Sequence, residues 1–135
     1  MALLDKEVKE LTDKHILSSD IASTKRICLQ PFEQKGSFIC GFFNYSANKC
    51  KIYSRRPFEC QLYPFLINRR GKKIYLAIDL HCPFARENLK SKKGEDYIIY
   101  LAKLFRTPEY SSILKDNPQI IQEYQEVIDL KELSA

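Results

Sequence analysis

Five cysteines, none of them in a CxxC pair, constrain the fold of this chain more than any other sequence feature. They are Cys28, Cys40, Cys50, Cys60 and Cys82, separated by 11, 9, 9 and 21 residues. Structural zinc sites usually use CxxC pairs, because one tight turn then presents two thiolates to the ion. Here the fold would have to bring each thiol to a metal separately, so the spacing alone is a weak metal signal.

The residues beside the cysteines strengthen that signal. Cys40 precedes Gly41, Cys82 precedes Pro83, and Cys60 lies between two prolines. Irregular backbone at such positions can point N–H groups at thiolate sulfur, which is typical of metal ligands. Buried, inert cysteines that pack as small apolar residues are the alternative. Residue by residue the alternative is favoured, whereas four cysteines within residues 40–82 leave the two interpretations evenly balanced.

Length and composition limit the class of protein. A chain of 135 residues with 44% apolar residues can build one core, so we expect a single domain over residues 1–135. No apolar run approaches the roughly 20 residues of a membrane-spanning helix, which argues against a membrane protein. Charged residues crowd positions 5–10, where a signal peptide would be apolar, so we expect a cytoplasmic protein. In that compartment cysteines favour metal or redox chemistry over disulfides.

Positive charge is concentrated in the middle of the chain. Residues 49–93 hold 12 basic and 3 acidic side chains, a net charge of +9. Solvation of turns and strand edges is the favoured explanation. Compensation of a metal–thiolate centre is a second, because a divalent metal with four thiolates carries a net charge of −2. Nucleic-acid binding ranks last, because no binding motif accompanies the charge.

The apolar pattern changes along the chain. Leu4, Val8, Leu11 and His15 recur at helical spacing and predict a helix over residues 3–15, with His15 packed or at its rim. Runs of Ile, Phe and Tyr between turn residues predict strands near residues 26–31, 37–43, 50–53, 61–67 and 73–79. The last two form the clearest hairpin, around residues 68–72. Pro57 can instead open a short helical turn that carries Cys60.

The remainder of the chain has helical periodicity. We predict helices over residues 83–89 and 95–106, and a final helix that starts at Pro118. Ile121, Tyr124 and Ile128 of that helix should be buried, because they recur at i, i+3 and i+7. The predicted fold class is therefore α+β, a small cysteine-cluster domain with an irregular antiparallel β segment between N-terminal and C-terminal helices.

A sixteen-residue segment carries a resemblance to a known family. It runs from Cys50 to Phe65 and is similar to the pattern C-x-I-Y-x-x-R-P-x-x-C-R-x-Y-P-F of the YkgJ-like CxxCxxCC family of zinc- or iron-chelating domains. The matching residues are Cys50, Ile52, Tyr53, Arg56, Pro57, Cys60, Tyr63, Pro64 and Phe65. Gln61 stands where arginine is common. Cys40 upstream and the Cys82-Pro83 pair downstream also resemble members of the family.

The resemblance implies one metal site with Cys40, Cys50, Cys60 and Cys82 as ligands and Cys28 outside it. Four thiolates suit tetrahedral zinc or iron, including a 4Fe-4S cluster. The N-terminal C-x-x-C-x-x-C-C cluster that names the family has no counterpart here, so the chain is either a divergent member or part of a longer protein. Arg55 or Arg56 could offset thiolate charge. Tyr53 and Tyr63 are expected to pack in the core.

Three functions remain open from the sequence. The first is a metal- or cluster-binding accessory module, and the second is an enzyme related to the flagellin lysine methylases, which share the family's domain. The third is a metal-free protein-interaction domain. His81 beside Cys82 gives little support to catalysis, although Asp79 lies on the same face of the strand and could orient the histidine. A solvent-exposed histidine beside a strand end is the favoured interpretation. An unidentified protein partner is compatible with the first and third functions, whereas a membrane or nucleic acid is not expected.

Overall fold

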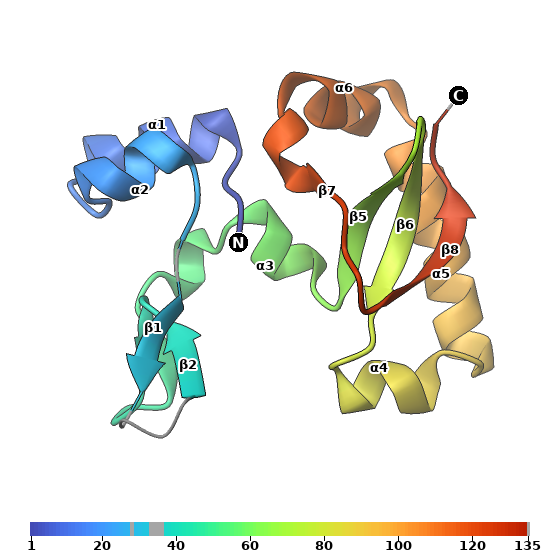
Figure 1. Ribbon diagram of the computed structural model, residues 1–135, viewed down its shortest axis with the longest axis horizontal. Coiled ribbons are helices and arrows are strands. Elements are labelled where there is room, and N and C mark those ends of the chain that lie inside the picture. The colour runs from blue at the N-terminus through green and yellow to red at the C-terminus, as the bar shows by residue number, and fades with distance from the viewer. Residues whose placement is uncertain (28, 33–36, 135) are drawn as a thin grey trace. The chain divides into compact units, whose positions relative to one another are not determined.

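A computed structural model describes residues 1–27, 29–32 and 37–134, with side chains described for residues 1–27 and 40–134. The contacts divide the chain into two compact units, Met1–Gln61 and Leu62–Ala135. Helices and largely antiparallel sheets occur in both, which confirms the α+β class (Figure 1). The single domain expected over residues 1–135 stays a prediction, and its test is whether the whole chain unfolds in one cooperative step.

The first unit begins with two helices, α1 (Asp5–Asp13) and α2 (Ser19–Thr24). The side chain of Glu7 closes the start of α1, since its Oε1 accepts a hydrogen bond of 2.8 Å from the Leu4 N–H. These bounds confirm the helix predicted over residues 3–15, shortened at both ends. His15 follows α1 with a positive φ of 56° and is exposed, as expected for a rim residue.

Short hairpins follow the helices. Strand β1 (Leu29–Phe32) pairs antiparallel with β2 (Ser37–Cys40), and β3 (Phe43–Asn44) pairs antiparallel with β4 (Lys49–Cys50). A 3₁₀ turn η1 (Tyr53–Arg55) and helix α3 (Phe58–Leu62) come next. The strand predicted at residues 50–53 therefore ends at Cys50, whereas the helical turn after Pro57 is confirmed.

The second unit is built on a four-stranded sheet. Strand β5 (Phe65–Arg70) pairs antiparallel with β6 (Lys73–Asp79), which confirms the predicted hairpin. Gly71 in its turn has a φ of +61°, a conformation that glycine adopts without steric cost. Strand β7 (Ile121–Gln122) runs parallel to β5, and β8 (Val127–Glu132) runs antiparallel to β6. The strand order is β7-β5-β6-β8.

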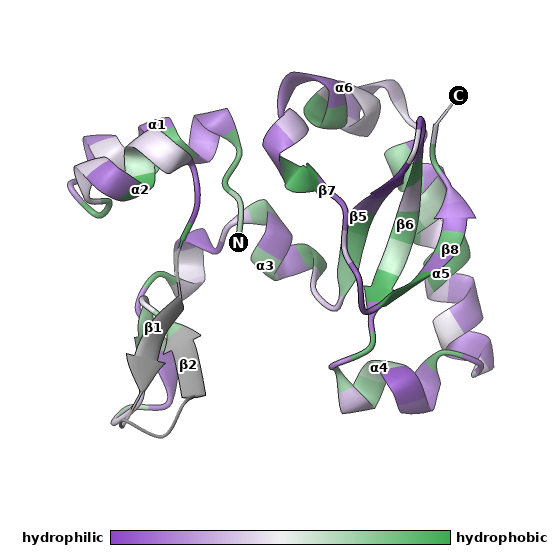
Figure 2. Ribbon diagram, viewed as in Figure 1, coloured by the Kyte–Doolittle hydropathy of each residue, from purple (hydrophilic) through white to green (hydrophobic). Residues whose placement is uncertain are grey.

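Helices complete the second unit. They are α4 (Pro83–Asn88), α5 (Lys92–Phe105), α6 (Pro108–Asp116) and the 3₁₀ turn η2 (Pro118–Ile120). The buried face of α5 consists of Ile98, Leu101, Ala102 and Phe105, and the helix contacts α6 and β8. Figure 2 shows green, apolar residues along β5 and β6 and on parts of α5. No helix in the described residues combines the length and apolar character needed to cross a membrane.

The final helix predicted from Pro118 is wrong. Helical geometry ends at Ile120, and the remaining residues form β7 and β8. Ile128 is 39% exposed, while Ile121 and Tyr124 are only partly buried. The physical reason is that the hairpin β5–β6 leaves unpaired N–H and C=O groups on both edges, and the β-branched Ile121, Val127 and Ile128 pair well there. Helices α4, α5 and α6 do follow the β5–β6 hairpin, as the predicted fold class requires, but the last element of the chain is the strand β8 and not a helix.

Candidate metal centre

A tight turn positions Cys50. The turn joins β3 to β4, whose register pairs Phe43 with Cys50 and Asn44 with Lys49. The Asn44 Oδ1 accepts a hydrogen bond of 3.2 Å from the Ala47 N–H, so the asparagine side chain stabilises the turn locally. The thiol of Cys50 is half-buried and reduced.

Two carboxylates fix the helix that carries Cys60. The Oε2 of Glu7 accepts a hydrogen bond of 2.6 Å from the Phe58 N–H at the start of α3. The Oε2 of the buried Glu59 accepts one of 2.8 Å from the Ala2 N–H, 57 residues away in sequence. Burial raises the pKa of both carboxyl groups, and these backbone hydrogen bonds partly offset the rise. Charged side chains thus hold Cys60 in place through main-chain contacts.

Cys40 and Cys50 lie against the same apolar cluster. Its buried members are Leu3, Ile27 and Ile52, and both cysteines pack on it from β2 and β4. Ile52 matches the isoleucine of the sequence motif, and its burial in this cluster gives that motif position a packing role. The Sγ of Cys60 lies 2.8 Å from the Met1 Sδ, two residues before Leu3. The N-terminal residues Met1 and Leu3 therefore lie in the surroundings of all three thiols.

The electrostatics of Cys60 include contributions from the other two thiols. The pKa of Cys60 is raised from 9.0 to about 11, first by burial and then by the charges of Cys40 and Cys50. Glu7 and Glu59 add smaller contributions of the same sign. Without a cation, Cys60 is a neutral thiol at physiological pH. A bound metal ion would reverse this preference, because a coordinating thiol is deprotonated by the ion's own charge.

This arrangement does not test the predicted four-ligand set. Within residues 1–27 and 40–134, no three His, Cys, Asp or Glu side chains already form a metal-binding group. Cys82 is half-buried and belongs to the second unit, where it precedes helix α4 as its N-cap residue. Cys28 lies outside the described residues. The set Cys40, Cys50, Cys60 and Cys82 therefore stays a prediction.

The tyrosines and arginines of the Cys50–Phe65 segment have surroundings that the sequence did not predict. Tyr53 and Tyr63 are 63% and 47% exposed, so the prediction that both pack in the core is wrong. The Arg56 guanidinium lies 4.1 Å from the centre of the Tyr53 ring, and cation–π attraction accounts for this exposed pair. Arg55 forms an ion pair of 3.6 Å with Glu10. The arginines thus have partners besides any metal–thiolate centre.

His81 belongs to a polar chain at the end of β6. Its Nδ1 lies 2.9 Å from the Asp79 Oδ1, and its Nε2 lies 2.5 Å from the Glu126 Oε2. The hydrogen bond to Asp79 and the charge of Glu126 raise the pKa of His81. Tyr63 also hydrogen-bonds Asp79. The sequence placed Asp79 beside an exposed His81 correctly. It missed Glu126, which reaches the histidine only because residues 121–132 form strands.

Of the comparisons with known proteins, the one with family models finds a match. Residues 1–83, more than half of the chain, match the family model CxxCxxCC, described as "Putative zinc- or iron-chelating domain". Neither the curated proteins nor the solved structures contain a match. The matched range holds all five cysteines and the segment from Cys50 to Phe65. The chain therefore belongs to the CxxCxxCC family.

Proposed function

We propose that this protein is a metal-binding module that holds one zinc or iron ion through Cys40, Cys50 and Cys60, with Cys82 as the fourth ligand. The observation that carries the proposal is that Cys40, Cys50 and Cys60 are reduced, half-buried thiols of the same unit, and that the first two raise the pKa of the third. Three neighbouring thiolates repel one another, and a cation between them relieves that repulsion.

The donor set fits both metals of the family description. Thiolate sulfur is a soft ligand, preferred by zinc and by iron–sulfur clusters. Zinc bound by four thiolates would have a purely structural role, since the ion is redox-inert and such a site has no open position. A 4Fe-4S cluster would add electron transfer. We favour an accessory role over an enzymatic one, because binding of a metal alone explains why the thiols are there and no substrate is needed to explain them.

Metal analysis of protein purified without oxygen tests the proposal. We expect about one zinc, or iron together with sulfide and a brown colour, per chain. Cys50→Ser and Cys60→Ser should each lose at least about tenfold in metal affinity, since even residues outside the first ligand shell cost 10–100-fold. Cys82→Ser tests the fourth ligand separately.

Cys28→Ser is the matched control and should retain the metal, because Cys28 is not in the proposed set. Full metal content in both Cys50→Ser and Cys60→Ser would contradict the proposal. The metal-free interaction domain would then be the better account of the chain.

A further inference from the structure

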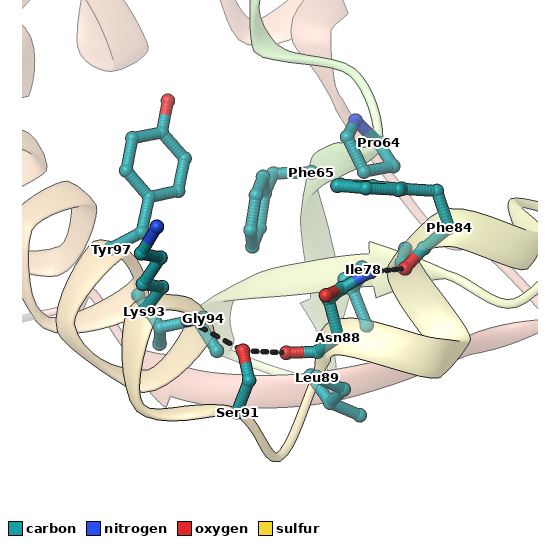
Figure 3. A pocket seen from close by; sticks show the side chains of 12 residues that line it. Pro64, Phe65, Ile78, Phe84, Asn88, Leu89, Ser91, Lys93, Gly94 and Tyr97 are labelled. Carbon is teal, nitrogen blue, oxygen red and sulfur yellow. Dashed lines mark hydrogen bonds between the residues drawn. The ribbon is translucent and has the colours of Figure 1, made fainter.

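The second unit contains a cavity that the metal site does not use. Its volume is about 300 Å³, at the lower end of the range of small-molecule pockets. Pro64 and Phe65 at the start of β5, Ile78 of β6, and Ala85 of α4 line its inner part (Figure 3). Phe65, Ile78 and Ala85 are buried and apolar, so the floor offers no polar group to water.

Two exposed aromatic side chains form the walls of the cavity. Phe84 of α4 is 72% exposed and Tyr97 of α5 is 49% exposed. The Tyr97 ring centre lies 5.6 Å from that of Phe65, and Figure 3 shows the three rings around the cavity. Large aromatic side chains that stay in water around a cavity mark a site that an apolar group can fill.

Charge at the mouth indicates what kind of apolar group fits. Lys93, in the first turn of α5, lines the cavity, and Lys92 beside it begins α5, while Lys90 lies between α4 and α5. Lys92 pairs with Asp96 at 3.8 Å. The Lys93 amine has no acidic partner in the part of the chain that the structure describes. An anionic group at the mouth would therefore complement its charge.

The other polar side chains of the mouth are already engaged. The Ser91 Oγ donates to the Asn88 carbonyl oxygen at 2.8 Å and accepts from the Gly94 N–H at 3.0 Å. The Asn88 Nδ2 donates to the Phe84 carbonyl oxygen at 2.8 Å. These bonds close the α4–α5 junction, and they leave the Lys93 ammonium as the charged group that a ligand can meet.

From this geometry we propose that the cavity binds a small carboxylate with an apolar body. The volume corresponds to about ten water molecules at roughly 30 Å³ each, which suits a chain or ring of similar size in non-hydrogen atoms. The body packs between Phe84 and Tyr97 on the floor at Phe65, and the carboxylate pairs with Lys93. The proposal does not depend on the metal site.

Titration of the full chain with sodium octanoate, followed by two-dimensional ¹H–¹⁵N NMR, tests the proposal. We expect saturable shifts at the amides of Phe84, Ala85, Lys93 and Tyr97. Lys93→Met should weaken octanoate binding by about fivefold, the contribution of an exposed ion pair, and should leave binding of neutral octanamide unchanged. Lys92→Met is the matched control, because Lys92 pairs with Asp96 and does not line the cavity. It should bind octanoate as the unchanged protein does.

Ala85→Leu tests the cavity itself. The larger side chain fills the space above the floor and should weaken octanoate binding at least about tenfold. If circular dichroism shows that this variant is unfolded, Phe84→Ala replaces it, since that side chain is largely exposed and its removal takes away one wall.

Three results would overturn the proposal: no saturable shifts up to millimolar octanoate, equal binding in the cavity variant, or equal loss in Lys93→Met for octanoate and octanamide. Concentration-dependent shifts of the same amides without ligand would also overturn it. In that case a second copy of the chain, and not a small carboxylate, covers the cavity.

Discussion

Asn68 stabilises the second unit through two hydrogen bonds to segments distant in sequence. Its side chain is fully buried, with 0% exposure. The Nδ2 donates to the Asp129 Oδ1 at 2.8 Å, and the Oδ1 accepts from the Tyr124 N–H at 2.8 Å. Asp129 also forms an ion pair with Arg70, so the asparagine belongs to a small polar network inside the sheet. Buried networks of this kind are stabilising only when every member is satisfied.

Asn68→Ala should therefore lower the free energy of unfolding by about 2–3 kcal/mol, because it leaves a cavity and takes the Asn68 partner away from a part-buried N–H and a part-buried carboxylate oxygen. Urea unfolding followed by circular dichroism measures the loss. Asn44→Ala is the control, since Asn44 is exposed and accepts a single turn hydrogen bond. Equal losses of unfolding free energy in Asn68→Ala and Asn44→Ala would show that burial of the asparagine does not determine the size of the loss.

The thiol of Cys60 makes a second prediction at this scale. Its pKa of about 11 in the metal-free protein means that the reactive thiolate is scarce at neutral pH. The rate of Cys60 alkylation by iodoacetamide should rise about tenfold per pH unit up to about pH 11, and mass spectrometry of peptides measures it. A rate that levels off near pH 9 would contradict the raised pKa.

The same shift has a consequence for stability. An unfolded chain loses the Cys60 proton near the ordinary pKa, whereas the folded chain keeps it until about pH 11. The unfolded state therefore binds fewer protons in this window, so the metal-free protein loses stability as pH rises through it.

The sequence motif predicts Cys50 and Cys60 as site residues, but not the groups that position them. Glu7 and Glu59 read as ordinary charged residues of a helix and a turn. Their partners are backbone N–H groups 51 and 57 residues away, and such pairings leave no local pattern. Only the folded first unit reveals them.

At the scale of elements, two glycines are required for different reasons, one for its backbone conformation and the other for lack of space around it. A Cβ at Gly71, in the turn between β5 and β6, would have open space around it but a φ of +61°. A Cβ at Gly94, in the first turn of α5, would lie 2.2 Å from the Asn88 carbonyl oxygen. The first glycine serves backbone conformation, and the second serves the close approach of α4 and α5.

Gly71→Ala should cost about 1–2 kcal/mol of unfolding free energy, and Gly71→Asn should recover part of it, because asparagine tolerates positive φ. Gly94→Ala should cost more, about 3 kcal/mol, since backbone must move to relieve the clash. Chemical denaturation measures all three. If Gly94→Ala loses no more unfolding free energy than Gly71→Ala, the backbone between α4 and α5 can move at little cost.

Elements with local signals were predictable, and those that depend on distant pairing were not. The hairpin β5–β6 needs only a turn between two apolar runs, and α4 and α5 show helical spacing over a continuous stretch. Strands β7 and β8 instead depend on partners far away, such as Ile67 for Ile121. Ile121, Tyr124 and Ile128 satisfy a helical spacing equally well, so periodicity alone selected the wrong element.

For the whole molecule, the two compact units give a test of metal-coupled folding. Removal of metal with a chelator should reduce hydrogen-exchange protection in β2, β4 and α3, because Cys40, Cys50 and Cys60 lie there. Protection in β5, β6 and α5 should change little, since these elements belong to the second unit and contain none of the proposed ligands. Exchange measured by mass spectrometry on the full chain resolves the two units.

Equal loss of protection in both units would contradict this expectation. It would instead support the single cooperative domain over residues 1–135 that the sequence predicts. A Cys50→Ser variant without chelator provides a second measurement, because it removes a proposed ligand and leaves the second unit unchanged in sequence.

The strand order β7-β5-β6-β8 also determines when the second unit can fold during synthesis. The hairpin β5–β6 leaves the ribosome early, but both of its outer neighbours come from residues 121–132. A nascent chain therefore exposes both edges of the hairpin while α4, α5 and α6 are still being made. The sheet can close only after this late segment emerges, so stalled chains that end before Ile121 should be the species most prone to aggregate.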